Sequence, residues 1–307
     1  MKVLFVGSGN KTNGEPSILI KNQAISLENK GFQIEYYLIQ GKGIIGYLKN
    51  IPSLRNKIKR ANYDVLHAHY SLSGFILSLS SLFLNNSKKI VSLMGSDTQI
   101  FGLKRLIIQI FHRLFWDVTI VKTQKMKESL KLKEAFVIPN GVNLSLFDSN
   151  QETNKNIVLF AADPSRKSKN FPLAKAAMEY LQSIGHRDLQ LKVVYNISQT
   201  EIVKEIQSAS CIILTSLWEG SPNIVKEAMA CNRPIVSTKV GDVNWLLSNV
   251  SGCFIANSNA KDIGEAIISA LQFSNQQGQT NGRSKLIQLG LDSESIADRL
   301  IEIYRRR

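Results

Sequence analysis

Short apolar runs recur along the chain, and each pair is separated by a segment long enough for a helix. In the first half these runs are Val3–Gly7, Ile34–Ile39, Val65–Ala68, Ile90–Leu93, Val118–Val121 and Phe136–Ile138. They resume as Ile157–Ala162, Leu191–Tyr195, Cys211–Thr215, Pro234–Ser237 and Cys253–Ala256. Strands that alternate with helices are typical of βαβ units, whose parallel sheets are covered on both faces. The pattern predicts an α/β fold with two such sheets.

A polar stretch, Asp148–Asn156, separates the two series of strands and is the expected linker. We therefore predict one domain over residues 1–147 and a second over 148–292. The last residues, "SESIADRLIEIYRRR", predict an amphipathic helix, since its apolar side chains share one face. These side chains are Ile296, Leu300, Ile303 and Tyr304. Two α/β domains that face each other form a cleft, so we expect a ligand between them.

The length of the apolar runs and the spacing of the cysteines exclude some classes of protein. No apolar run reaches the roughly 18 residues of a membrane-spanning helix, and "MKVLFVGSGN" is interpreted as a first strand and not as a signal peptide. Cys211, Cys231 and Cys253 have neither a paired framework nor metal-ligand spacing. We expect reduced thiols, a cytoplasmic protein and no metal site.

Positive charge is concentrated in the first half of the chain. The net charge is +14, and residues 1–146 hold 20 Lys and Arg against 8 Asp and Glu, whereas the rest hold 18 against 16. Such a basic half attracts nucleic acid, an anionic membrane or a phosphorylated substrate. The alternative is a solvated surface that keeps the protein soluble.

Residues 216–242, "SLWEGSPNIVKEAMACNRPIVSTKVGD", carry two carboxylates around a turn. Glu219 follows the strand "CIILTS", where parallel sheets bind ligands. Ser221 is the predicted N-cap of the next helix and Pro222 its first residue. The free N–H groups of Gly220–Asn223, at the positive end of the helix, predict an anion site. Glu227 falls at the border of the helix face that packs on the sheet.

Carboxylates beside an anion site suit a ligand that combines phosphates with hydroxyl groups. A nucleoside diphosphate sugar does so, because its phosphates accept hydrogen bonds from the amides while its ribose and sugar hydroxyls donate hydrogen bonds to the carboxylates. Gly14 is a candidate for close backbone approach to the diphosphate. The first strand is followed by "VGSGNKTNG", which lacks the dinucleotide fingerprint and argues against an NAD-dependent enzyme.

The string "EGSPNIVKEAMACNRPIVSTKVGD" resembles the donor-site signature of retaining glycosyltransferase family 4, the glycosyl transferases group 1. "VIPNGVNLSLF" and "DVLHAHYSLSG" resemble further segments of that family. The resemblance implies the GT-B fold, with two Rossmann-like domains facing across a cleft and residues 293–307 crossing back to the first. It implies that Glu219 faces the donor sugar, that Glu227 holds the ribose, and that Gly220, Ser221, Pro222 and Asn223 complete the donor site.

The same resemblance implies a basic pair that holds the diphosphate without a metal ion or a cofactor. In "AADPSRKSKNF", Lys169 matches the lysine of the pair. The family's arginine position holds Asp163-Pro164 here, so Arg166 is the substitute we assign. A guanidinium and an ammonium would stabilise the charge on the leaving diphosphate.

Candidate residues on the acceptor side lie in the first domain. We assign His67 and His69 to opposite faces of their strand, and His69, nearer the carboxyl end, is the candidate for the cleft. "VSLMGSD" resembles a family segment that often carries a histidine where Met94 stands. That departure makes Gly95, Ser96 and Asp97 the available polar groups.

The segment "LKRLIIQIFHRLFW", residues 103–116, is basic on one side and apolar on the other. It could rest on an anionic membrane, or it could be an ordinary crossover helix packed on the sheet, which we favour. The basic first domain suggests an acceptor that is anionic or lies on a membrane, such as a lipid-linked glycan.

We therefore expect a metal-independent, retaining glycosyltransferase that uses a UDP- or GDP-sugar, with residues 1–147 binding the acceptor and residues 148–292 the donor. Its expected location is the cytoplasm, in part at the inner face of the membrane. The alternatives are a GT-B nucleotide-sugar epimerase and a basic nucleic-acid-binding protein. The second leaves the glutamate pair unexplained, and no nucleic-acid-binding module is recognisable, so we expect no nucleic acid partner.

Overall fold

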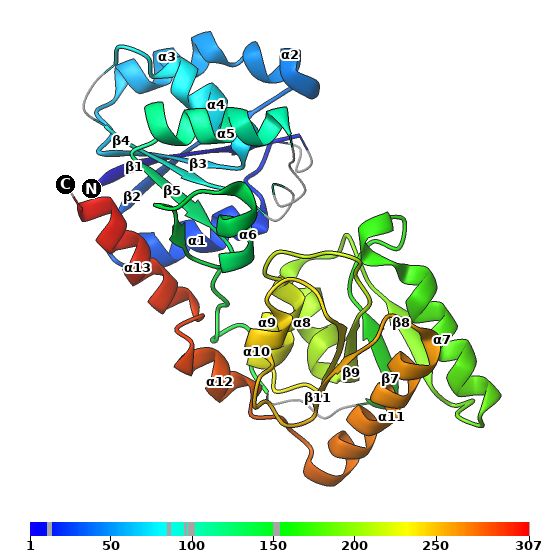
Figure 1. Ribbon diagram of the computed structural model, residues 1–307. Coiled ribbons are helices and arrows are strands. Elements are labelled where there is room, and N and C mark those ends of the chain that lie inside the picture. Colours follow the sequence, from blue (N-terminus) through cyan, green and yellow to red (C-terminus); the bar gives the residue numbers. More distant parts are fainter. Residues whose placement is uncertain (11–13, 85–86, 95–96, 98–101, 150–153, 307) are drawn as a thin grey trace. The chain divides into compact units, whose positions relative to one another are not determined.

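The computed structural model describes residues 1–10, 14–84, 87–94, 97, 102–149 and 154–306. The chain divides into two compact units (Figure 1). Unit 1 consists of Met1–Gly141 together with Ser293–Arg307, and unit 2 consists of Val142–Asp292. None of the helices in these described ranges is long and apolar enough to cross a membrane.

Unit 1 is a six-stranded parallel sheet in the order β2-β1-β3-β4-β5-β6. Its strands are β1 (Lys2–Ser8), β2 (Gln33–Ile39), β3 (Val65–His69), β4 (Lys88–Ser92), β5 (Val118–Val121) and β6 (Phe136–Val137). The helices are α1 (Ile18–Glu28), α2 (Gly43–Leu48), α3 (Ile51–Arg60), α4 (Ser71–Ser80), α5 (Leu103–Leu114), α6 (Gln124–Leu130) and α13 (Ser293–Arg305). Helices cover both faces of this sheet (Figure 1).

Unit 2 is a five-stranded parallel sheet in the order β11-β10-β9-β7-β8. Its strands are β7 (Asn154–Phe160), β8 (Gln190–Val193), β9 (Ala209–Leu214), β10 (Ile235–Thr238) and β11 (Cys253–Ala256). The helices are the 3₁₀ helix η2 (Lys167–Lys169), α7 (Phe171–Ser183), α8 (Gln199–Ser208), α9 (Asn223–Ala230), α10 (Val243–Leu246), α11 (Ala260–Gln277) and α12 (Gly282–Gln288).

The apolar runs of the sequence all became strands. Each of the eleven predicted runs overlaps one strand of the structure. Their side chains are buried because a parallel sheet is covered on both faces; Ala209–Leu214, for example, is buried along its whole length. The predicted fold class, two Rossmann-like α/β domains, is confirmed by these sheets.

The terminal helix α13 packs in unit 1, where it contacts α1. Its predicted apolar face, including Ile296, Leu300 and Tyr304, is buried. The Lys88 ammonium donates a hydrogen bond to the carbonyl of Ile303 at 2.6 Å. This helix thus belongs to the first sheet although it follows the second along the chain.

Each sheet contains a point where the strand order reverses direction. In unit 1 it lies between β1 and β3, and in unit 2 between β7 and β9. Loops that leave the carboxyl ends of two such strands diverge to opposite faces, and the space between them is where open α/β sheets bind ligands. The loops after β7 and β9 are therefore the first place to look for a site.

Candidate active site

Hydrogen bonds join the loops after β7 and β9. The Leu217 amide donates to the carbonyl of Ser168 at 2.9 Å, and the Thr215 hydroxyl lies 3.1 Å from the carbonyl of Lys169. Asn170 ends η2 in the left-handed conformation, with φ of 49°, and α7 starts directly after it. These bonds fix η2 against the end of β9, so residues about 50 positions apart in sequence become neighbours.

Lys169 and Glu219 form an ion pair at this junction. Lys169 Nζ lies 2.5 Å from Glu219 Oε1, and the two side chains are 14% and 15% exposed. The Ser216 hydroxyl donates to the same Oε1 at 2.8 Å. Both contacts use Oε1. The structure thus brings together two of the residues that the sequence singled out.

The loop after β10 closes over Gly220. Asp242 donates its amide to the Gly220 carbonyl at 3.2 Å, and Gly241 adopts a φ of +53°. A Cβ atom at position 241 would lie 2.1 Å from that carbonyl oxygen. Only glycine fits there, because the close approach and the positive φ both exclude a side chain.

Helix α9 begins one residue later than the sequence suggested. Its first residue is Asn223 and its N-cap is Pro222, which makes no side-chain cap. The predicted N-cap role of Ser221 is therefore wrong: its side chain interacts with the Asp242 carboxyl, whose pKa it lowers against the effect of burial. The physical reason is the extended conformation of Pro222 (ψ of 120°), which moves the start of the helix beyond the reach of Ser221.

Three ionisable side chains lie close together around α9. Glu227 is partly buried, and burial raises the pKa of its carboxyl to about 7 against the opposing charge of Lys226. Lys226 is fully buried; burial lowers the pKa of its ammonium to about 8, and the carboxylates of Asp242 and Glu227 oppose that shift. Burial also raises the pKa of Asp242 to about 6.

Sequence analysis missed Lys226 and Asp242. The helical pattern gave no signal for Lys226, because successive residues of a helix are turned by about 100° and position 226 lies off the apolar face of Val225 and Met229. Val225 and Met229 are fully buried, as the helical pattern predicted.

Two further predicted donor-site residues are Arg166 and Gly14. Arg166 is exposed just before η2, and no contact among the described residues links its side chain to Glu219. Gly14 lies in unit 1 after β1, where its φ of +88° and a 3.3 Å hydrogen bond from its amide to Gly9 define a turn. The roles of both in binding a diphosphate stay predictions.

The two histidines of β3 lie on the same face of the sheet, so their assignment to opposite faces is wrong. Their rings stack with centroids 4.4 Å apart. Residues i and i+2 of a strand point the same way, since side chains alternate with a period of two. His67 Nδ1 lies 2.7 Å from the Tyr304 hydroxyl, and Nε2 lies 2.8 Å from that of Ser92.

His69 is buried, and neither of its ring nitrogens has a hydrogen-bond partner among the described residues. Burial lowers the pKa of this imidazole to about 3, and the charge of Lys122 adds to the effect, so the ring is neutral.

Of the other predicted acceptor-side residues, Gly95 and Ser96 lie outside the described residues. Asp97 is buried, accepts hydrogen bonds from the Ser71 hydroxyl (2.7 Å) and the Met94 amide (2.8 Å), and has a pKa raised to about 6 by burial. It ties the start of α4 to the loop after β4.

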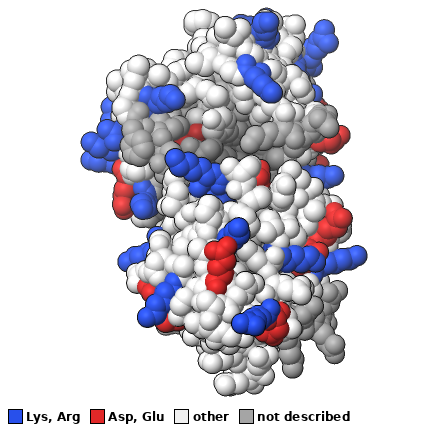
Figure 2. All heavy atoms as spheres, turned by 90° about the vertical axis from the view of Figure 1, so that its right-hand side faces the viewer, with Lys and Arg blue, Asp and Glu red and all other residues white. Residues whose placement is uncertain are grey.

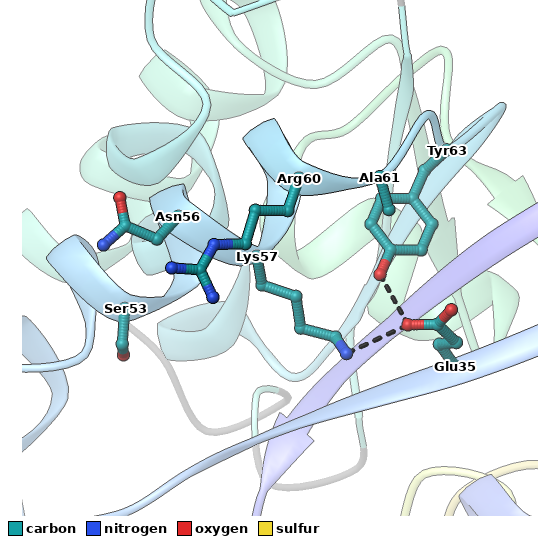
Figure 3. A pocket seen from close by; sticks show the side chains of 7 residues that line it. All are labelled: Glu35, Ser53, Asn56, Lys57, Arg60, Ala61 and Tyr63. Atoms are coloured by element: carbon teal, nitrogen blue, oxygen red, sulfur yellow. Dashed lines mark hydrogen bonds and ion pairs between the residues drawn. The ribbon is translucent and has the colours of Figure 1, made fainter.

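A pocket in unit 1 is lined by residues of α3 and by Glu35 and Tyr63 (Figure 3). The Glu35 carboxylate accepts hydrogen bonds from Lys57 (2.9 Å) and Tyr63 (2.7 Å) and pairs with Lys2. Lys2, followed by Tyr63 and Lys57, holds the pKa of this carboxyl down at about 2. Its charge is satisfied internally, so the pocket is a weaker candidate than the junction of η2 and β9.

Within the described ranges, no three His, Cys, Asp or Glu side chains are grouped to hold a metal ion.

Comparison with known proteins identifies the class. Residues 157–272 match the family model "Glycosyl transferases group 1", and residues 16–125 match "Glycosyl transferase 4-like". Over 66% of its length the chain is 24% identical to TuaC of Bacillus subtilis (strain 168), a glycosyltransferase whose name links it to teichuronic acid biosynthesis; the match spans 60% of that relative. It is 22% identical, over 87% of its length and 81% of the relative, to an Escherichia coli galactosyltransferase. That relative is named UDP-Gal:alpha-D-GlcNAc-diphosphoundecaprenol alpha-1,3-galactosyltransferase.

Solved structures show the same fold. Anabaena Alr3699/HepE in complex with UDP and glucose superimposes with a TM-score of 0.75, at 14% identity, over 99% of both chains. A match at 14% identity shows only that the fold is shared. The evidence for the family comes from the two family models. The chain therefore belongs to the group 1 glycosyltransferases of the GT-B fold.

Proposed function

We propose that the protein transfers a sugar from a UDP-sugar to a lipid-linked glycan, with retention of the anomeric configuration and without a metal ion. The observation that carries the proposal is the Lys169–Glu219 pair at the strand-order reversal of unit 2. UDP is favoured over GDP because the galactosyltransferase relative is named for UDP-Gal and the Anabaena structure contains UDP. A lipid-linked acceptor is favoured by the diphosphoundecaprenol in two relatives' names.

In this proposal the side chains at the junction divide the work. The Lys169 ammonium, fixed by the bonds between the two loops, stabilises the negative charge that develops on the leaving diphosphate. Arg166, exposed beside η2, adds its guanidinium to the same anion. Glu219 keeps one oxygen on Lys169 and Ser216 and presents the other to a sugar hydroxyl.

The remaining donor contacts come from the start of α9. The amides around Gly220 and Asn223, at the positive end of the helix, donate hydrogen bonds to the phosphate oxygens. Glu227 takes the ribose hydroxyls and does so best as a carboxylate, which is the stronger acceptor. With no committed nucleophile in the proposal, the acceptor hydroxyl attacks on the face from which the diphosphate leaves, and the departing diphosphate helps to take its proton.

A thermal-shift panel of UDP, GDP, ADP and CMP tests the donor site first. A nucleotide at 100 times its dissociation constant stabilises the folded state by about 2.7 kcal/mol. We expect a shift with UDP that is lost in Glu227→Ala, and a shift with GDP instead would reassign the base. Product analysis with and without an acceptor then separates transfer from epimerisation, and the anomeric configuration of the product tests retention. No shift with any nucleotide diphosphate would contradict the proposal.

A further inference from the structure

Helix α5 carries a stripe of apolar side chains on its outer side. The α5 stripe consists of Leu103, Leu106, Ile110 and Leu114, which are 72%, 51%, 42% and 71% exposed. Their spacing of three and four residues places them along one side of the helix. Large apolar side chains scattered singly on a surface are ordinary, but a continuous stripe over three turns marks a contact surface.

The α5 stripe is distinct from the side of the helix that packs on the rest of unit 1. Ile108 is the buried residue of the helix. Polar contacts hold the same side: the Gln109 amide donates to the Leu130 carbonyl at 2.9 Å, and His112 Nδ1 lies 2.8 Å from the Thr119 hydroxyl. The interpretation of residues 103–116 as an ordinary crossover helix therefore explains the inward side only, and the stripe needs a partner of its own.

An aromatic side chain extends the stripe at its C-terminal end. Phe83, in the turn after α4, is 99% exposed and lines a surface pocket together with Leu114 and Phe115. Lys89 borders the same pocket. A phenyl ring beside an ammonium suits the boundary between lipid headgroups and acyl chains, where apolar and charged groups both find partners.

The rim of the stripe is basic. Lys104 and Arg113 are exposed on either side of it, and residues 102–116 contain no Asp or Glu. Helix α2 contacts α4, as α5 does, and carries the exposed pair Ile44 and Ile45. The segment 42–60, which spans α2 and α3, also lacks Asp and Glu and holds Lys42, Lys49, Arg55, Lys57, Lys59 and Arg60. Figure 2 shows Lys and Arg side chains gathered without acidic neighbours at the end of unit 1 where α2 and α3 lie.

We propose that the α5 stripe and Phe83 rest on an anionic membrane surface. Apolar side chains would enter the interface while Lys104, Arg113 and Lys89 meet lipid phosphates, and this pairing of an apolar stripe with a basic rim selects lipid over a neutral partner. The inference deepens the proposed function, because a lipid-linked acceptor lies at such a surface, and it rests on that function for its purpose. Its geometry depends on α5 and the neighbouring Phe83 and Lys89, and on no residue of the donor site.

Flotation with vesicles tests this inference. The full chain is mixed with vesicles of phosphatidylcholine, or of phosphatidylcholine and phosphatidylglycerol, at low and at high salt. We expect binding to the anionic vesicles at low salt, and Leu106→Glu/Ile110→Glu lowers the bound fraction by about tenfold or more. Lys104→Gln/Arg113→Gln weakens binding and reduces its salt dependence, since screening acts on the lost charges. The matched control is Ile287→Glu, which changes a 51% exposed isoleucine in unit 2 and leaves flotation unchanged.

Three outcomes would overturn the inference: no flotation of the unaltered chain, equal flotation of Leu106→Glu/Ile110→Glu, or self-association in sedimentation that this variant abolishes. The last would assign the stripe to a second copy. Thermal unfolding of each variant reports on folding. The UDP thermal shift, unaffected by changes in α5, keeps the two proposals apart: flotation without a UDP shift supports the membrane surface and contradicts the donor site.

Discussion

Both units contain a parallel sheet, but the side chains at the carboxyl ends of the strands are in opposite environments in the two units. In unit 2 the strand-order reversal holds a partly exposed ion pair, Lys169 with Glu219. In unit 1 the corresponding strand, β3, ends in two buried histidines, one of them bonded to Tyr304 of the terminal helix. One architecture therefore supports a charged, solvated edge and a neutral, enclosed one.

Desolvation explains the difference. A buried charge is costly unless it is paired, so a buried imidazole stays neutral, as the pKa of about 3 for His69 shows. The loops of unit 2 leave Lys169 and Glu219 partly exposed and paired with each other. An edge of this kind is suited to a diphosphate, whereas the described part of the edge in unit 1 is suited to packing.

The largest expected effect comes from removing the charge of unit 2. Lys169→Ala should lower kcat/KM by about 10²–10³, because a positioned donor to the leaving group is worth that much in the transition state. Steady-state kinetics with the donor identified by the nucleotide panel measures it. Lys167→Ala, an exposed lysine of the same 3₁₀ helix, is the control and should change little. Equal losses in both variants would mean that the loop's overall charge matters and the ion pair does not.

A smaller effect concerns the protonation of Glu227. With a pKa of about 7 its carboxylate fraction rises through neutral pH, so UDP should bind about tenfold more tightly at about pH 8 than at about pH 6. Glu227→Gln should bind UDP more weakly. Calorimetric titration of this variant with UDP in the same buffers shows how much of the pH dependence comes from the ionisation of UDP itself. A pH dependence that survives in the variant would assign it to the nucleotide.

The same carboxyl predicts the sign of a stability change. Its pKa in the folded state is raised above the ordinary 4.5, so the folded state binds the proton more tightly than the unfolded chain does. The contribution to stability is present below about pH 4.5 and is lost as the pH rises to about 7.

The smallest effect tests the enclosed edge of unit 1. Tyr304→Phe removes the hydroxyl that partners His67 and should cost about 1–2 kcal/mol of unfolding free energy, since a buried ring nitrogen loses its hydrogen bond. Urea denaturation measures the loss, and UDP affinity should stay unchanged. Tyr195→Phe, an exposed tyrosine in unit 2, is the control. A fall in UDP affinity with Tyr304→Phe would contradict the separation of roles between the units.

Local patterns predicted the elements well and the side-chain environment unevenly. All eleven strands were predicted because apolar runs bounded by polar segments encode buried parallel strands directly. The capping role of Ser221 was not predicted correctly, since one dihedral angle of Pro222 decides where the helix begins. The buried state of Lys226 depends on what packs around α9, which no local pattern contains.

The amino-acid sequence alone determined the class of fold, the strands and the motif that holds Glu219 and Glu227, because each follows from residues close together in the chain. The tertiary structure decided which of these groups meet. It paired Lys169 with Glu219 across about 50 residues, placed Tyr304 against His67 across more than 200, and turned the apolar side of α5 outward. These outcomes depend on how distant segments pack and on how much water each charge keeps, and both are properties of the folded chain as a whole.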